Sequence, residues 1–425
     1  MPGSPQYDLA VIGAGYVGVP LAATFGEAGQ RVLLVDVQTN VVDALNRGES
    51  HIEDVTSERL SVLTEKGLVV ATSDYDQVKH AHAVLIALPT PLSRQREPDL
   101  SYIERAARSL APVIQRGQVI VLESTTWPGT TREILQPILE EGSGLKAGED
   151  FHLAMSPERV DPGREDWTTK TTPKVVGGIS EASTKAAADV YRAAIDTVHE
   201  VSTPEAAELT KLLENIYRAV NIALVNELAQ LTDRMGIDVW EVVDAAATKP
   251  FGFASFKPGP GLGGHCIPID PFYLTWKARE FDFSTRFIEL AGEVNNNMPY
   301  FCRSLISQAL NHGRQTSLSG AKILVLGVAY KSDIGDTRES PAIKLIELLR
   351  RAGAEVSYHD PYVPELPESG LWSVELDAKA YDCVVVVTAH SSVDYEDLID
   401  RSHVVVDLRN ATGEKGTASD KVWKL

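Results

Sequence analysis

The chain has 425 residues, of which 44% are hydrophobic and 23% charged, proportions that are typical of folded globular proteins. At about 150 residues per domain, this length predicts two or three domains. The formal net charge of −19 argues against binding to nucleic acid or to an anionic membrane, because both require a basic face. Uncharged apolar stretches are too short to span a membrane, and a short polar leader precedes the first strand, so we expect a cytoplasmic protein. Three cysteines do not make a disulfide framework, and we expect reduced thiols.

Residues 1–202 carry the pattern of an α/β domain. An apolar run at 7–12 predicts a buried parallel strand, 16–29 a helix, and 31–35 a second strand that ends at Asp36. Further apolar runs at 83–88, 119–122, 152–155 and 174–176 extend the unit to a mostly parallel, doubly wound sheet.

Residues 203–312 are predicted to be a central helical domain. Apolar residues recur at helical spacing from Pro204 to Met235, with proline in the first turn. A helix of about 30 residues spans about 45 Å, longer than one domain needs. We therefore expect it either to connect domains or to form the contact of a homodimer.

Residues 313–425 return to an α/β pattern, with strands predicted at 322–326, 355–359, 383–387 and 404–407 and a helix at 341–351. The predicted fold class is therefore α/β, with two doubly wound Rossmann-like domains joined by a central helical domain that contains one long helix. Two such domains can each bind one half of a reacting pair.

The first motif, Gly13-Ala14-Gly15-Tyr16-Val17-Gly18, follows a predicted strand and opens a predicted helix. This is the dinucleotide fingerprint in its full context: Gly13 permits a tight turn, Gly15 lets the backbone approach a pyrophosphate, and Gly18 allows close helix packing. Asp36, at the end of the next strand, can accept hydrogen bonds from a ribose diol and would repel a 2′-phosphate. The motif predicts NAD rather than NADP.

The second motif places Cys266 directly after a segment with glycines at 259, 261, 263 and 264. A backbone of this kind bends sharply, so the thiol is expected to be accessible. A thiol there can add to an aldehyde to give a thiohemiacetal, and a second hydride loss gives a thioester that water cleaves. The commoner role of a free cysteine is a small buried apolar residue, which suits Cys302 and Cys383 but not Cys266.

Over essentially its whole length the chain resembles the UDP-glucose/GDP-mannose dehydrogenase family, and most closely the branch that acts on UDP-N-acetylhexosamines. The resemblance rests on the Gly13 fingerprint, Ser124-Thr125, the segments 156–159 and 211–215, the Cys266 loop, and Lys331 with the segment 336–341. It implies that the protein oxidises the primary alcohol of a UDP-sugar to a carboxylate in two successive NAD-dependent steps.

The resemblance also implies catalytic roles. Cys266 is expected to be the nucleophile and Asp270 to order or activate water. Lys211 and Asn215 share one helix face at i, i+4 spacing, and the family assigns them to stabilisation of a developing oxyanion. Thr125 and Glu158 follow strands, where open α/β sheets gather active sites. Glu158 is expected to be a general base acting through water, with a raised pKa; alternatively Thr125 caps a turn and Glu158 pairs with Arg159.

Two sets of binding residues follow from the same resemblance. The third domain is expected to hold the UDP part of the substrate, with Lys331 near the sugar or phosphates and Arg338 reaching toward the cofactor. No cysteine and histidine cluster has zinc-ligand spacing, so we expect no metal. The cofactor set comprises Gly13, Gly15, Tyr16, Val17, Gly18, Asp36, Thr90, Thr125 and Arg338, and the substrate set comprises Glu158, Arg159, Val160, Lys211, Asn215, Phe256, Gly259, Gly263 and Lys331.

Two departures from the UDP-glucose branch bear on the sugar. That branch commonly carries an arginine ahead of the cysteine loop and a lysine just before the loop aspartate, where this chain has residues 250–253 and Ile269. We therefore predict UDP-N-acetylglucosamine as substrate and a polysaccharide precursor as product, with UDP-N-acetylmannosamine as the nearest competitor and UDP-glucose behind it. A single-step dehydrogenase of the hydroxyacid or 6-phosphogluconate type, which needs no nucleophilic thiol, and a non-catalytic sugar-nucleotide sensor stay open as alternatives.

Overall fold

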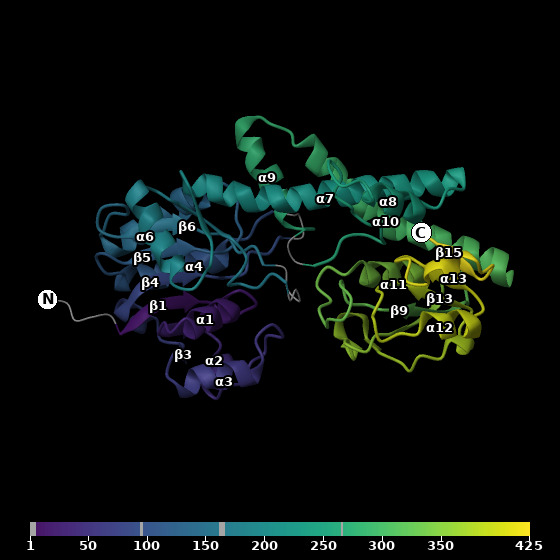
Figure 1. The fold of residues 1–425 in the computed structure, drawn as a ribbon, viewed down its shortest axis with the longest axis horizontal. Coiled ribbons are helices and arrows are strands. Elements are labelled where there is room, and N and C mark those ends of the chain that lie inside the picture. Colours follow the sequence, from purple (N-terminus) through teal and green to yellow (C-terminus); the bar gives the residue numbers. More distant parts are fainter. Residues whose placement is uncertain (1–5, 94–96, 161–165, 265–266) are drawn as a thin grey trace. The chain divides into compact units, whose positions relative to one another are not determined.

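The computed structural model describes residues 6–93, 97–160, 166–264 and 267–425. The chain forms two compact units. The first contains residues 1–214 and 272–283, and the second contains residues 215–271 and 284–425. Figure 1 shows that each unit has its own sheet with helices packed around it. The division of the chain into three domains at 202 and 312 stays a prediction.

The first unit is built on an eight-stranded sheet of order β3-β2-β1-β4-β5-β6-β7-β8. All neighbours are parallel except β6 and β7. The strands are β1 (Tyr7–Ile12), β2 (Val32–Val35), β3 (Val69–Thr72), β4 (Ala81–Ile86), β5 (Val119–Leu122), β6 (His152–Met155), β7 (Lys174–Gly178) and β8 (Val198–Val201). The helices are α1 (Gly18–Glu27), α2 (Thr39–Asn46), α3 (Ser57–Glu65), α4 (Ser101–Leu110), α5 (Gln136–Ser143) and α6 (Glu181–Arg192).

The strand order from β3 to β6 is the doubly wound one, whose direction reverses between β1 and β4. Ligands of open α/β sheets bind outside the carboxyl ends of the strands at this reversal. In this unit the reversal places the loop that begins at Gly13 beside the segment that follows β4. The predicted fingerprint therefore lies where the fold favours a dinucleotide.

Both faces of this sheet are buried. Leu9 and Val11 belong to the same core as residues of α1 and α6, and the rings of Phe25 and Tyr191 from those helices lie 6.2 Å apart. The residues that alternate with them, such as Ala10 and Ile12, are buried on the opposite face. Burial on both faces explains why these strands read as continuous apolar runs.

The second unit has a five-stranded, all-parallel sheet of order β10-β9-β13-β14-β15. Its strands are β9 (Lys322–Leu326), β10 (Glu355–His359), β13 (Cys383–Val386), β14 (Val405–Asp407) and β15 (Val422–Lys424), and a small hairpin joins β11 (Glu365–Leu366) to β12 (Leu371–Trp372). Its helices include α8 (Val239–Ala247), α10 (Arg286–Arg314), α11 (Pro341–Arg351), α12 (Tyr395–Arg401) and α13 (Gly413–Thr417).

The long helix α7 (Pro204–Met235) has the bounds that its sequence pattern predicted. The first unit ends at Glu214 and the second begins at Asn215, so the chain passes between the units within this helix. It returns to the first unit within α9 (Asp270–Ala278) and passes back to the second unit after Phe283. The second core joins residues of α7, α8 and α10 to one face of the small sheet, and the Trp240 indole of α8 donates to the backbone oxygen of Leu425 at 2.8 Å.

Most predicted elements are confirmed. The strands predicted at 119–122, 152–155, 322–326 and 355–359 and the helix at 341–351 have the predicted bounds. The two-residue strands β11 and β12 were not predicted, and neither were β3, β8 and β15. These last three strands are three or four residues long, and β8 at the sheet edge carries exposed His199 and Glu200, which breaks the apolar run.

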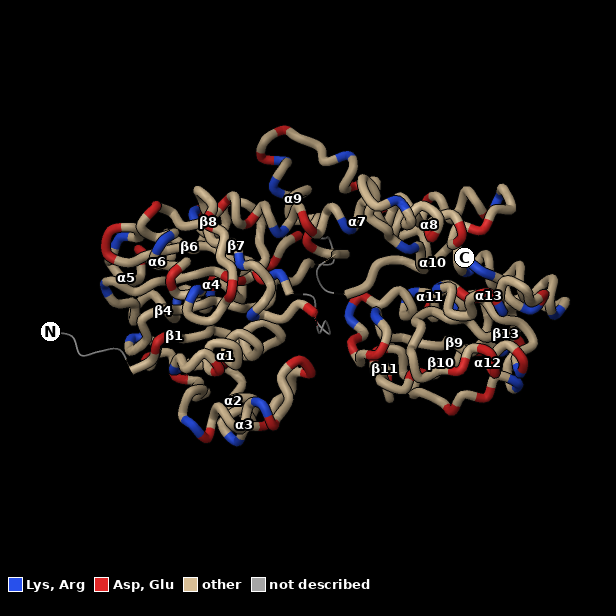
Figure 2. Tube along the Cα trace, viewed as in Figure 1, with Lys and Arg blue, Asp and Glu red and all other residues tan. Residues whose placement is uncertain are grey.

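Lysine and arginine are scattered among acidic residues over both units (Figure 2). Along the described residues no element of the tube is basic throughout. Within the described ranges, no helix combines the length and the hydropathy that a membrane crossing requires.

Candidate active site

The three fingerprint glycines meet three different surroundings. Gly13 has a φ of 103°, and a Cβ there would overlap the carbonyl oxygen of Ala87. A Cβ on Gly18 would overlap the carbonyl oxygen of Gly13, so close packing of α1 requires glycine. A Cβ on Gly15 would meet no protein atom within 4 Å. Because protein packing does not require glycine at this position, the open space suits the close approach of a pyrophosphate, and the loop fits NAD.

Asp36 lies directly against this loop. One carboxylate oxygen accepts from the backbone N–H of Ala14 at 2.8 Å and the other from that of Gln38 at 2.9 Å. His51, which sequence analysis missed, places its Nε2 3.0 Å from the backbone oxygen of Ala14. The carboxylate is thus held at the end of β2, where the fingerprint predicts the ribose.

Hydrogen bonds connect the residues that follow β4 to those that follow β5. The Thr90 hydroxyl donates to the backbone oxygen of Thr125 at 2.8 Å, and the hydroxyl of Tyr273 donates to the backbone oxygen of Thr90. The hydroxyl of Ser124 accepts from the backbone N–H of Leu88 at 2.9 Å. The predicted residues Thr90 and Thr125 are therefore neighbours at the carboxyl edge of the sheet.

Glu158 is held by three donors. One carboxylate oxygen accepts from the backbone N–H groups of Arg159 and Val160, each at 2.7 Å, and the other lies 3.0 Å from the Lys174 ammonium. Burial raises the pKa of Glu158, but Lys174 and the two N–H groups outweigh it and the pKa is lowered. The predicted raised pKa is therefore wrong.

The alternative in which Glu158 pairs with Arg159 is also wrong. The Arg159 guanidinium lies 2.6 Å from the Glu214 carboxylate and donates to the backbone oxygen of Pro173. Lys174 of the neighbouring strand β7 pairs with Glu158 instead, because the loop turns the Arg159 side chain toward α7.

Sequence analysis missed the group that accompanies Lys174. Its ammonium lies 2.6 Å from the Glu123 carboxylate, which also accepts from the Tyr191 hydroxyl. Burial raises the pKa of Glu123 to about 7, although Lys174 and Tyr191 favour its ionised form. The available signal was a lysine at the start of an otherwise apolar strand, because a buried lysine requires a carboxylate partner.

A second buried carboxyl group lies at the start of α7. Glu208 accepts from the backbone N–H of Gly129 at 2.6 Å, from the N–H of Thr131 at 2.9 Å and from its hydroxyl at 2.7 Å. Burial raises its pKa to about 7 against these three donors. Lys211, a predicted catalytic residue, follows three positions later and is 7% exposed.

In the second unit the structure brings Asn215 and Asp270 together. The Asn215 amide donates to the Asp270 carboxylate at 2.6 Å, and both residues are buried. Cys266 and His265 lie outside the described residues. The predicted role of Cys266 therefore stays a prediction.

The glycines ahead of Cys266 pack against protein. The N–H of Gly259 donates to the Asn226 side chain at 2.9 Å, and a Cβ there would lie 2.5 Å from the Arg409 guanidinium. A Cβ on Gly263 would lie 2.6 Å from the Cβ of Tyr330. The nearby predicted residue Phe256 stacks edge-on against Tyr217, with ring centroids 5.7 Å apart.

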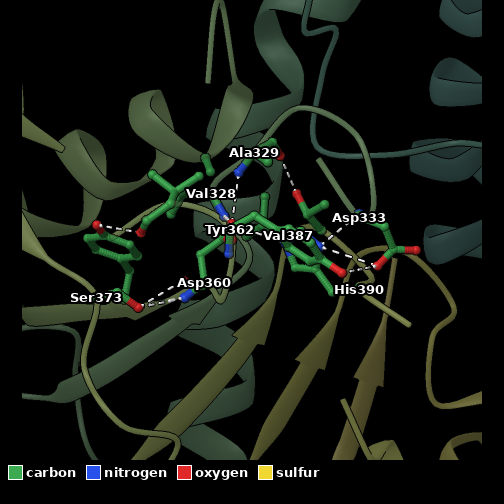
Figure 3. A network of polar contacts seen from close by, with 12 residues as sticks. Val328, Ala329, Asp333, Asp360, Tyr362, Ser373, Val387 and His390 are labelled. Atoms are coloured by element: carbon green, nitrogen blue, oxygen red, sulfur yellow. Dashed lines mark hydrogen bonds and ion pairs between the residues drawn. The ribbon is translucent and has the colours of Figure 1, made fainter. Parts of the chain in front are cut away.

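The loop that contains Lys331 is held by a network of polar contacts around Asp360 and His390 (Figure 3). One carboxylate oxygen of Asp360 accepts from the N–H groups of Val328 and Ala329 at 2.7 and 3.1 Å and lies 3.0 Å from Nε2 of His390. Because Nδ1 of His390 accepts from the backbone N–H of Asp333 at 3.0 Å, the proton of the neutral ring lies on Nε2.

The same aspartate is kept ionised. Burial raises the pKa of Asp360, but His390 and the backbone N–H groups lower it further than burial raises it. Beyond this network, the Arg338 guanidinium contacts the Asp336 carboxylate, with Nη2 2.6 Å from one oxygen, and the backbone oxygen of Arg338 accepts from the N–H of Gly264 at 3.0 Å.

The other two cysteines are buried as predicted, Cys302 in α10 and Cys383 in β13. Burial raises the pKa of Cys302 to about 12 and that of Cys383 higher still, so neither is a nucleophile. In the part of the chain that the structure describes, no three histidine, cysteine, aspartate or glutamate side chains gather as possible metal ligands.

The NAD binding domain of the UDP-glucose/GDP-mannose dehydrogenase family matches residues 7–195, its central domain 205–297 and its UDP binding domain 324–414. A UDP-N-acetyl-D-mannosamine dehydrogenase from Pyrococcus horikoshii is 37% identical over 412 residues, which cover 96% of each chain. A UDP-N-acetyl-D-glucosamine 6-dehydrogenase from Pseudomonas aeruginosa is 32% identical over 412 residues, 94% of this chain and 96% of the relative.

Among solved structures, a UDP-D-ManNAc dehydrogenase from Pyrococcus horikoshii superposes with a TM-score of 0.87 at 36% identity, with 96% of each chain covered. The family resemblance, the fold class and the cofactor predicted from the sequence are thereby confirmed. This chain belongs to the UDP-glucose/GDP-mannose dehydrogenase family and is an NAD-dependent UDP-sugar dehydrogenase.

Proposed function

We propose that the protein oxidises the C6 hydroxymethyl group of a UDP-N-acetylhexosamine to a carboxylate. The observation that carries this proposal is similarity along nearly the whole chain to relatives named for UDP-N-acetylmannosamine and UDP-N-acetylglucosamine. The sequence predicted the glucosamine epimer, whereas the relative at 37% identity is named for the mannosamine epimer. We therefore take UDP-N-acetylmannosamine as the first candidate and UDP-N-acetylglucosamine as the second.

The overall reaction converts R–CH2OH, two NAD+ and water into R–COO−, two NADH and three protons. NAD, when bound, accepts one hydride in each of the two oxidations. Gly15 would allow the close approach of its pyrophosphate, and Asp36 would accept hydrogen bonds from its ribose. The Cys266 thiolate adds to the aldehyde carbon to give a thiohemiacetal, and loss of the second hydride converts this adduct into a thioester. Water then adds to the thioester, and the carboxylate is released as the thiolate leaves.

The remaining predicted residues support these steps. Lys211 and Asn215 stabilise negative charge on the oxygen at C6, and Asp270, which accepts from Asn215 at 2.6 Å, orders the attacking water. Glu158 accepts the proton of that water. The lowered pKa of Glu158 keeps it ionised at neutral pH, so it is ready to act as a base.

The yield of NADH per sugar tests the proposal. Purified protein with excess NAD and a limiting amount of UDP-N-acetylmannosamine, UDP-N-acetylglucosamine or UDP-glucose is expected to give two NADH per molecule with one N-acetylhexosamine. Cys266→Ala is expected to abolish net oxidation and to keep NAD and UDP-sugar binding. The matched control Cys302→Ala, a buried cysteine of α10, keeps the yield of two.

Other yields decide against the proposal. One NADH per sugar points to a single-step dehydrogenase that needs no thiol. No NADH with any of the three sugars, together with intact binding, points to a non-catalytic sensor. Loss of binding in Cys266→Ala means that the cysteine loop is structural.

We also propose that two copies of this chain associate along α7. The helix exposes apolar side chains at spacings of three, four and seven residues, which lie on one face of a helix. These residues are Leu209, Leu213, Tyr217, Leu224, Leu228, Leu231 and Met235, and their exposed fractions run from 38% to 63%. Seven exposed apolar side chains on one helix favour a protein partner, and a second copy presents the same face.

Light scattering after gel filtration tests the association. The wild type is expected to have twice the chain mass, and Leu224→Glu with Leu231→Glu the mass of one chain. Trp372→Glu, at a residue that is 67% exposed in β12, is the control and stays dimeric. A wild-type monomer, or a dimeric double variant, refutes the proposal.

A further inference from the structure

The proposed base Glu158 is the outermost of a buried cluster of four side chains. Lys174 of β7 contacts Glu123 at 2.6 Å and Glu158 at 3.0 Å, and its ammonium lies 5.3 Å from the ring centre of Tyr191 in α6. The Lys174 side chain is 4% exposed, Glu123 is inaccessible, and Glu158 is 16% exposed at the open end. The mechanism proposed above uses only the outer member of this cluster.

The cluster contains two carboxyl groups but only one lysine. Lys174 can balance one carboxylate, so a second ionised carboxylate remains uncompensated in a buried site. Glu158, which also accepts from two backbone N–H groups, stays ionised. Glu123 shares its remaining oxygen with the Tyr191 hydroxyl, and burial raises the pKa of Glu123 to about 7. The cluster therefore gains or loses a single proton near neutral pH, and Glu123 carries it.

We propose that Lys174 and Glu123 are positioning residues for Glu158, and that the ionisation of Glu123 sets how readily Glu158 takes a proton from water. This inference rests on the proposed role of Glu158 as the base of thioester hydrolysis. Lys174 fixes one oxygen of Glu158 while the backbone fixes the other, so the carboxylate has a single orientation.

The ionisation state of Glu123 acts through Lys174. When Glu123 is protonated, the charge of Lys174 stabilises Glu158 alone, and Glu158 is a weaker base. When Glu123 ionises, it shares that charge, and Glu158 becomes a stronger base. The groups that face Glu123 are Lys174, the hydroxyl of Tyr191 and the charge of Glu158, while Arg159 is turned toward Glu214.

The pH profile of kcat distinguishes this role from a structural one. In the wild type kcat is expected to rise about tenfold as pH passes through about 7, which corresponds to about one unit in the basicity of Glu158. Glu123→Gln is expected to hold kcat at its low-pH level and to leave KM for the UDP-sugar unchanged within about twofold. The control Glu208→Gln removes the other buried carboxyl group with a pKa raised to about 7 and keeps the rise.

Tyr191→Phe is a second variant, which keeps the aromatic ring that belongs to the core of the first unit. It removes the donor that favours ionised Glu123, so the rise in kcat is expected to move to higher pH by about one unit. A merely structural role lowers kcat at every pH and does not move the profile. Infrared titration adds a readout without turnover: the carboxylic-acid band that disappears near pH 7 is expected to be smaller than in the wild type in both Glu123→Gln and Glu208→Gln, because each variant removes one carboxyl group with a pKa of about 7. An undiminished band in Glu123→Gln would contradict the titration of Glu123.

Glu158→Gln, measured in parallel, distinguishes a failure of the proposed role of Glu158 from a failure of the proposed roles of Lys174 and Glu123. If this variant turns over at the wild-type rate, the proposed role of Glu158 is wrong and the inference falls with it. If it loses turnover by more than about a hundredfold while Glu123→Gln and Tyr191→Phe keep the wild-type profile, only the inference is overturned.

Discussion

Glu208→Gln should change how the stability of the first unit depends on pH. Glu208 is fully buried, and its pKa is raised from 4.5 to about 7 in the folded protein. Between these values the folded protein holds a proton that the unfolded chain has released. The protonated form therefore contributes stability at low pH, and this contribution is lost as pH rises through about 7.

The size of the effect follows from the two pKa values. Linkage gives about 2.5 kcal/mol of stability lost between pH 5 and pH 8 from this one group. Glutamine cannot titrate, so Glu208→Gln lacks this loss. Its amide group also meets the N–H donors of Gly129 and Thr131, which costs about 1–3 kcal/mol at every pH. The wild type is thus expected to be clearly more stable than Glu208→Gln at pH 5, and this difference in stability is expected to shrink or reverse at pH 8.

The assay is urea unfolding at several pH values, followed by hydrogen exchange of a peptide around Trp127, whose ring packs 4.8 Å from that of Trp276 in the same unit. Glu205→Gln, one turn earlier on α7, is the contrast. Its carboxylate pairs with Arg132 at 2.8 Å and its pKa is lowered, so its contribution is lost as pH falls. A stability difference between wild type and Glu208→Gln that is constant from pH 5 to pH 8 refutes the reasoning.

Three further variants test the binding loops. Asp36→Ala is expected to raise KM for NAD by at least about tenfold, because about 1.5–3 kcal/mol of hydrogen bonding to a charged group is lost, and an unchanged KM would contradict the ribose contact. Gly18→Ala places a Cβ on the carbonyl oxygen of Gly13, and calorimetry should detect no NAD binding; normal affinity would mean that the loop adjusts. Asn215→Ala removes the 2.6 Å donor to Asp270 and should lower stability by about 1–3 kcal/mol together with turnover; a loss of stability with normal turnover would make Asn215 structural.

Local sequence was sufficient to predict a structural feature where a residue type in a given pattern has a single structural role. The apolar runs at 119–122 and 322–326 could only be buried strands, since both faces of each sheet are covered. The roles of Gly13 and Gly18 followed from their spacing, because a strand, a tight turn and a helix leave no room for a Cβ at either position. Cys302 and Cys383 were recognised as buried residues from their apolar surroundings.

Contacts between residues distant in sequence were beyond such reasoning. The pKa of Glu158 was predicted to be raised because a general base in a closed cleft suits a raised pKa, and the contact with Lys174 at 3.0 Å was not foreseen. The sequence did not show that Tyr330 packs against the glycines at 263 and 264. The support of the Lys331 loop by Asp360 and His390 gave no sequence signal, because neither residue belongs to a motif.

The sequence by itself determined the two sheets, the long helix, the dinucleotide loop and the family, because each depends on a short-range pattern of apolar residues, glycines and one acid. Only the tertiary structure decided which carboxyl group holds a proton near neutral pH. That property belongs to Glu123 and Glu208 and not to Glu158, and it is set by burial and by the donors that three-dimensional packing brings to each carboxylate.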